Sequence, residues 1–258
     1  MVNLHACVGK THFIFRACLY PWHLLRHRPA RLFLALGLLA IIGWGVAFAG
    51  LQLWAESHYR AAQEALKHYD YPKALEHLHH CLQVRSESFQ TTFLAARTAR
   101  RAQNLDEARQ LLDRCEKLVH GQADLILFER TLLRAQTSEK EDFDKVERYL
   151  WACVEAGHAE KPLVLEALAN GYLRMFRYHA AYPCLDMLLK EEPNHVPGLV
   201  WRAWLWNNLG NDEEGLKDLR RLVELDPSNG NRLRLGGMLI RQNLAHEALP
   251  HFDHLNQA

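Results

Sequence analysis

The sequence predicts an all-α protein, a solenoid of about six helical hairpins preceded by one apolar helix. Two observations predict the solenoid. Pro193 and Pro227 lie 34 residues apart, and the apolar residues that precede Pro193 recur at the same interval before Pro227. Within each copy, spacings of four and then three residues place these side chains on one helix face. A third observation, an uncharged run over residues 32–53, predicts the apolar helix.

The repeat is clearest between residues 162 and 227. Its first copy contains Leu165, Ala169, Tyr172, Ala181, Leu185 and Leu188, which recur as Leu199, Ala203, Trp206, Gly215, Leu219 and Leu222. Gly210 and Asn211 suit a tight turn between two helices, and a proline after the second helix ends it. Because two helices cannot bury both apolar faces by themselves, neighbouring hairpins have to complete the core.

This order of residues resembles the tetratricopeptide repeat (TPR), whose pattern W-x2-L-G-x2-Y, A-x3-F and P describes two antiparallel helices. The resemblance covers roughly residues 56–256 and implies a right-handed α-solenoid. We expect a repeat domain over 56–258, with six units centred near residues 74, 108, 146, 181, 215 and 248. In the third unit the expected helices are 125–135 and 143–156, joined by a longer polar turn over 137–142.

An apolar helix is expected ahead of the repeats. Residues 32–53 (LFLALGLLAIIGWGVAFAGLQL) carry no charge and one polar side chain, Gln52. At about 1.5 Å per residue, this run crosses a hydrocarbon core of about 30 Å as one helix, and Trp54 follows where interfacial aromatics are enriched. We therefore predict a transmembrane helix or signal anchor over 32–54, behind a basic leader, 1–31.

Charge on the two sides of this run predicts its orientation. The leader contains five basic residues and no acid. Beyond the run, Arg60 and Lys67 are offset by Glu56 and Glu64. Since positive charge is retained on the cytoplasmic side, we expect a cytoplasmic N-terminus and an extracytoplasmic repeat domain, periplasmic in a bacterium.

Two alternatives remain for the apolar run. The triplet 47–49, Ala-Phe-Ala, resembles a signal-peptidase site, and cleavage there would release a soluble repeat protein. The run also fits a buried helix of a soluble protein. It exceeds the roughly 7 to 15 apolar residues of a signal peptide, which favours a retained anchor.

Composition and motifs argue against catalysis, nucleic-acid binding and cofactor binding. A formal net charge of +1, with 49% hydrophobic and 24% charged residues, is typical of a globular chain and gives no support for a nucleic-acid partner. The sequence contains no H-E-x-x-H, no C-x-x-C, no G-x-S-x-G and no glycine-rich phosphate loop. We therefore expect no enzyme, no cofactor and no metal site.

Cysteines and histidines are interpreted as ordinary structural residues. Cys81, Cys115 and Cys153 fall at equivalent positions of successive second helices, too far apart for disulfides, so we expect small packing side chains. Cys7 and Cys18 lie in the leader, where a cytoplasmic location would keep them reduced. Two histidine pairs have a spacing compatible with a metal but lack further ligands, namely His77 with His80 and His251 with His254.

The resemblance implies a binding surface, because the first helices of TPR units line a concave face. Arginine can capture carboxylates, asparagine can pair with a peptide backbone, and tryptophan can supply an aromatic anchor. Three tryptophans on one helix cannot all face one core stripe, so Trp204 is expected to contact a ligand. The positions assigned to this face are Phe93, Arg97, Arg100, Arg101, Glu166, Asn170, Leu173, Arg174, Val200, Trp204, Asn207 and Asn208.

These features predict a membrane-anchored TPR scaffold or assembly factor whose partners are proteins or peptides. The alternatives are a cleaved, secreted or periplasmic TPR chaperone or adaptor and, less favoured, a membrane-bound enzyme. No polar capping helix follows the last unit, so Leu249, Phe252 and Leu255 are expected to be partly uncovered and to permit self-association.

Overall fold

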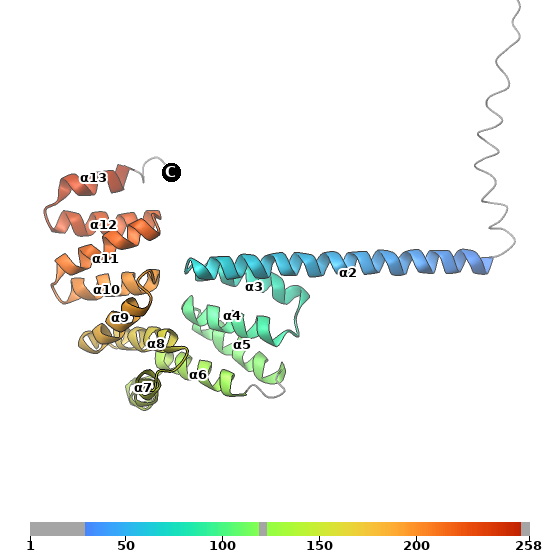
Figure 1. Ribbon diagram of the computed structural model, residues 1–258, viewed down its shortest axis with the longest axis horizontal. Coiled ribbons are helices and arrows are strands. Elements are labelled where there is room, and N and C mark those ends of the chain that lie inside the picture. Colours follow the sequence, from blue (N-terminus) through green and yellow to red (C-terminus); the bar gives the residue numbers. More distant parts are fainter. Residues whose placement is uncertain (1–28, 119–122, 254–258) are drawn as a thin grey trace, which may run out of the picture. The chain divides into compact units, whose positions relative to one another are not determined.

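The computed structural model describes residues 29–118 and 123–253, and its chain divides into two units that meet between Glu56 and Ser57. The helices follow one another as labelled in Figure 1. Among the described residues there is no β-strand. The leader assigned to residues 1–31 lies outside the described residues except for its last three.

The first unit contains the apolar part of helix α2 (Pro29–Lys67). Proline suits the first position of a helix because its missing N–H is not needed there. Large side chains point outward all around this part of α2, including Phe33, Trp44 and Leu53, each more than two-thirds exposed. One window of α2 is long and apolar enough to cross a membrane, and none of it is buried. The predicted single apolar helix is therefore present.

The second unit is an array of six consecutive helical hairpins, which confirms the predicted α-solenoid of TPR type. Residues 57–67 of α2 pair with α3 in the first hairpin, and each later hairpin joins an even-numbered helix to the next odd-numbered one (Figure 1). The bounds are α3 (Tyr71–Val84), α4 (Phe89–Arg101), α5 (Leu105–Leu118), α6 (Ala123–Thr137), α7 (Lys140–Glu155), α8 (Lys161–Arg174), α9 (Tyr178–Glu191), α10 (Val196–Asn208), α11 (Asp212–Leu225), α12 (Asn229–Arg241) and α13 (Ala245–Asp253).

Five of the six hairpin turns share one backbone device. A residue with positive φ follows the first helix, namely Tyr69, Gln103, Phe176, Gly210 or Asn243. The next N–H then donates back to a carbonyl five residues earlier, as Asn104 does to Ala99 at 2.9 Å and Asn211 to Trp206 at 2.9 Å. This is the Schellman arrangement, which satisfies the last carbonyls of a helix. The repeat in sequence is therefore also a repeat in backbone conformation.

The third hairpin departs from this device and from the expected turn. Only Ser138 and Glu139 separate α6 from α7, whereas a polar turn over 137–142 was expected. Residues 140–142 instead form the first turn of α7. The negative charges of Glu141 and Asp142 interact favourably there with the positive end of the helix dipole. The polar residues mark a helix start rather than a loop.

Small residues and leucines form the core between hairpins. The six residues used to count the units, Ala74, Ala108, Val146, Ala181, Gly215 and Ala248, are all buried in the second helices. Cys81, Cys115 and Cys184 are buried and Cys153 half-buried, and all four are free thiols. Burial raises the pKa of Cys115 to about 11, so its thiol packs as a small apolar group.

Candidate protein-binding surface

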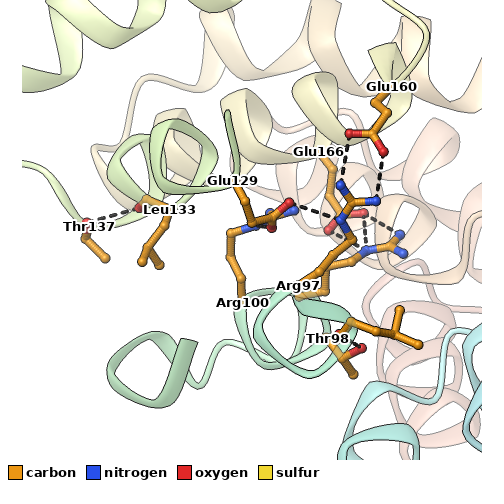
Figure 2. Close-up of polar contacts among 10 residues, drawn as sticks. Arg97, Thr98, Arg100, Glu129, Leu133, Thr137, Glu160 and Glu166 are labelled. Atoms are coloured by element: carbon orange, nitrogen blue, oxygen red, sulfur yellow. Dashed lines mark hydrogen bonds and ion pairs between the residues drawn. The ribbon is translucent and has the colours of Figure 1, made fainter. Parts of the chain in front are cut away.

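The first helices α4, α6 and α8 bring three arginines against three glutamates. Arg97, Arg100 and Arg101 lie toward the end of α4, with Arg100 and Arg101 in its last turn. Their carboxylate partners are Glu129 on α6, Glu160 just before α8, and Glu166 on α8. Figure 2 shows Arg97 between Glu129 and Glu160. We call these six residues the arginine–glutamate cluster.

Glu129 lies at the buried end of this cluster. Its carboxylate accepts from Arg100 Nε at 2.6 Å and from Arg97 Nε at 3.0 Å, and both Glu129 and Arg100 are fully buried. Although burial opposes ionisation of Glu129, the charges of Arg100 and Arg97 outweigh it and lower the pKa of this carboxyl. Arg97 in turn donates from both terminal nitrogens to Glu160, at 2.8 and 2.9 Å. The charges are therefore balanced within the fold.

Glu166 links the cluster to α10. It accepts from Arg101 Nη2 at 2.7 Å and from Nε at 3.0 Å. His195, the N-cap residue of α10, accepts the Gly198 N–H through Nδ1 at 2.9 Å. The proton of its neutral ring therefore lies on Nε2, which donates to Glu166 at 3.1 Å. Burial raises the pKa of Glu166, but Arg101 and the His195 hydrogen bond outweigh it and hold this pKa at about 2.

Residues at the turn between α2 and α3 contact Arg101 and His195. The Arg101 guanidinium lies 4.5 Å from the centre of the Tyr71 ring, a cation–π contact. Tyr69 stacks edge-on against His195 at 4.7 Å and donates its hydroxyl to Glu192 at 3.3 Å, across 123 residues of sequence. Burial and the Glu192 charge raise the pKa of Tyr69 to about 12, which keeps the phenol a donor. Hairpins far apart in sequence are thus joined.

The remaining positions predicted on α4 and α8 have separate environments. Phe93 stacks on Phe89 at 5.6 Å and lies under Arg97 at 5.1 Å. Asn170 and Leu173 are half-buried on α8, and Arg174 is exposed and donates to the Ser138 carbonyl. The structure therefore does not gather these side chains with Trp204 into one groove. Partner binding by Phe93, Arg97, Arg100, Arg101, Asn170 and Arg174 stays a prediction.

An open groove lies farther along the array, between α10 and α12, with a volume of about 610 Å³. Three predicted residues line it, namely Val200, Trp204 and Asn207. Asn208 is adjacent but exposed, and its side chain donates to the Trp204 carbonyl at 2.8 Å. We call this cavity the α10–α12 groove.

The three tryptophans of α10 differ in exposure and contacts, and Trp201 and Trp204 both line the groove. Trp201 is half-buried and Trp206 packs against Tyr182 with ring centres 4.8 Å apart. Trp204 is 43% exposed in the groove and is supported edge-on by Tyr178 at 5.4 Å. A tryptophan held at one edge and exposed on its face is a rigid apolar contact surface. Whether Trp204 contacts a partner is taken up as a proposal below.

Sequence reasoning missed the α12 side of the groove, which consists of Leu233, Arg234, Gly237, Met238 and Arg241. A signal was present. Leu233, Gly237 and Arg241 stand 33 residues after Val200, Trp204 and Asn208, the interval that also separates Gly215 from Ala248. Applying the groove positions to the sixth unit would have found three of the five.

Metal binding finds no support among the residues that the structure describes, where no group of three or more His, Cys, Asp or Glu side chains is placed to hold an ion. His77 lies instead with its Nδ1 2.9 Å from His58 Nδ1, a hydrogen-bond distance. His80 packs its ring 4.7 Å from that of His58. Of the second pair, His251 lies on α13 and His254 lies outside the described residues.

Comparison with known proteins gives likeness in structure only. No protein-family model matches the chain, and a search of curated proteins gives no match. Solved structures that resemble it include MamA of AMB-1 (17% identity over 66% of this chain and 90% of that one, TM-score 0.46) and MamA of Desulfovibrio magneticus RS-1 (14% over 79% and 94%, TM-score 0.37). PilW, a type IV pilus biogenesis factor, shares 12% over 79% and 92%, with a TM-score of 0.49. These values support no assignment of function, which therefore rests on the groove itself.

Proposed function

We propose that this chain is a membrane-anchored scaffold or assembly factor that binds other proteins through the α10–α12 groove. The observation that carries the proposal is Trp204, a large aromatic side chain 43% exposed within a cavity of about 610 Å³. Exposed tryptophans in concave, mostly apolar sites are typical binding anchors. The assigned role is binding, with no reaction attached to it.

Membrane anchoring is the second part of the proposal. Its support is the apolar window of α2, which is long enough to span a bilayer and leaves its large side chains uncovered. The helix also runs unbroken through residues 47–49, where a signal peptidase would have to cut. A retained helix would tether the repeat domain to the membrane, where membrane-bound partners meet it at a raised effective concentration.

Topology follows from the charge of the leader. We propose that the N-terminus is cytoplasmic and the repeats are extracytoplasmic, because the basic residues precede the apolar run. Protease added outside cells whose outer barrier has been opened should digest the repeat domain and leave the leader intact. Intact mass of the membrane-extracted protein distinguishes this anchor from a cleaved, secreted adaptor, which would begin near Gly50.

Trp204→Ala tests the binding role. A photo-crosslinking amino acid at Asn207 in full-length protein in native membranes should capture specific partners, and the Trp204→Ala background should lose them. Removing a central aromatic anchor costs about 2 kcal/mol or more, which is roughly a 30-fold loss of affinity. Tyr149→Ala is the matched control, since Tyr149 is an exposed aromatic on α7 outside the groove. Equal capture by all three proteins would reject the groove as the binding site.

A further inference from the structure

The α10–α12 groove combines an apolar floor with a cationic rim. Trp204, Leu233 and Met238 supply the apolar surface, and Arg234 and Arg241 are the charged residues that line it. No carboxylate belongs to the lining. The groove therefore differs in charge from the chain as a whole, whose formal net charge is only +1.

Neither rim arginine makes a hydrogen-bonded ion pair with a carboxylate, and only Arg241 has a weak ion pair, with Asp212. Arg234 donates to the neutral Asn231 side chain at 2.9 Å. Arg241 contacts the Met238 sulfur at 2.8 Å, and its nearest carboxylate oxygen, on Asp212, is 3.7 Å away. That carboxylate already accepts from Gln242 at 2.8 Å.

Nearby arginines show what full pairing looks like in this part of the chain. Arg202, also on α10, donates to both oxygens of Asp218 at 2.9 and 2.7 Å. Arg220 on α11 pairs with Glu247 at 2.6 Å. Arg202 and Arg220 are thus closely paired outside the groove, whereas at its rim Arg234 donates to a neutral amide and Arg241 has only the weaker contact with Asp212. An occupant that brings its own carboxylates would complete the pairing, since charge-assisted bonds to arginine are strong and directional.

The size and remaining polar groups of the groove limit what fits. A cavity of about 610 Å³ is in the range of sites for small ligands, so it accommodates a short stretch of chain rather than a folded domain. Gly237 has no atom within 4 Å of where a side chain would begin, which leaves the α12 wall open opposite α10. Asn207 lines the groove and carries both a donor and an acceptor suited to a peptide backbone.

We propose that the α10–α12 groove binds an acidic peptide segment with one large apolar side chain. That side chain packs on Trp204 and Leu233, and the flanking carboxylates pair with Arg234 and Arg241. The inference rests on the proposed function and adds the chemical class of the partner. Two arginines beside an apolar floor match such a segment better than a nucleic-acid backbone, which calls for an extended basic stripe.

Selection from a display library of short random peptides tests this inference on full-length protein in nanodiscs. Wild-type protein should enrich peptides that combine aspartate or glutamate with a large apolar residue. The charge-reversed variant R234E/R241E should stop enriching them and select basic peptides instead. For one enriched acidic peptide, each single reversal should weaken binding about tenfold or more, and added salt should weaken it further.

Two controls separate a failed inference from a failed fold or a failed function. R221E reverses an exposed charge on α11 outside the groove and should behave as wild type. G237L adds a side chain at a position where a Cβ meets no neighbouring atom, and we expect it to block the groove and abolish selection while circular dichroism shows that the protein stays folded. Peptides that need Trp204 but show no excess of acids would overturn this inference and leave the proposed function standing. Absence of any Trp204-dependent peptide would overturn both.

Discussion

The first helices of hairpins two to four (α4, α6 and α8) and those of hairpins five and six (α10 and α12) share one architecture and differ in the contacts of their polar side chains. On α4, α6 and α8, the arginine–glutamate cluster pairs three cations with three anions, and several of these side chains are fully buried. On α12, Arg234 and Arg241 border the open α10–α12 groove, where Arg234 donates to the neutral Asn231 and Arg241 lies 3.7 Å from Asp212. Arginine side chains join hairpins to one another in the first region and line an open groove in the second.

This difference follows from where the acids lie. Glu129 and Glu166 face inward on α6 and α8, and Glu160 lies just before α8, so each arginine of α4 meets a carboxylate of a later hairpin. The equivalent stretch of α12 contains no acid. In repeat arrays, where each unit contacts mainly its neighbours, such cross-hairpin pairs add contacts between units distant in sequence.

The largest expected effect is a loss of stability when the arginine–glutamate cluster is broken. Glu129→Ala leaves Arg100, which is fully buried, without its carboxylate, and removing one partner of a buried pair costs about 3 to 5 kcal/mol. We expect the free energy of unfolding of the full-length protein in nanodiscs to fall by this amount in urea titrations. Amide exchange should accelerate first in α4 and α6.

Glu247→Ala is the matched control for Glu129→Ala. Glu247 pairs with Arg220, and each side chain is about half exposed, so the pair contributes at most about 1 kcal/mol. If the two variants lost equal stability, the cluster would not be what holds the first hairpins together.

The stability of the protein should also depend on pH through Glu166, which belongs to the arginine–glutamate cluster. The folded-state pKa of Glu166 is about 2, below its ordinary value, so its ionisation stabilises the fold above about pH 4.5. This contribution, on the order of 3 kcal/mol, is lost as pH falls from about 4.5 to about 2. The stability gap between wild type and Glu166→Gln should therefore be largest near neutrality and shrink in acid. A gap that is constant with pH would show that Glu166 stabilises by packing alone.

The hairpins could be predicted from sequence because their signals are local. Apolar residues at helical spacing, small residues at helix crossings and the interval of about 34 residues each depend on neighbours along the chain. The same signals placed Arg97, Arg100 and Arg101 on one inner helix. What they could not reveal is that Glu129, Glu160 and Glu166 reach these arginines, since that depends on the curvature of the whole array.

The contact between the first hairpin and the end of α9 could not be predicted from local patterns for the same reason. Tyr69 and Glu192 are 123 residues apart, and no repeat interval relates them. The groove was half predicted, because Val200, Trp204 and Asn207 were found by their offset from the packing stripe. Its α12 half was not predicted, because the first helix of the sixth unit matches the repeat pattern only weakly outside Leu235 and Gly236. Leu249 is 56% exposed there, and self-association through this end stays a prediction.

The smallest expected effect comes from replacing one glycine in each region with alanine and comparing the two changes in stability. A Cβ at Gly171 on α8 would lie 2.4 Å from the Ala135 carbonyl oxygen and from the Phe143 ring, so Gly171→Ala should cost about 1 to 3 kcal/mol by overpacking. At Gly237 on α12 nothing lies within 4 Å, so Gly237→Ala should stabilise the helix by up to about 1 kcal/mol. Urea unfolding of both variants measures the difference. The two changes in the free energy of unfolding should have opposite signs, because hairpins three and four are in close contact at Gly171, whereas the α12 wall of the groove is open. Equal destabilisation by the two substitutions would contradict an open wall.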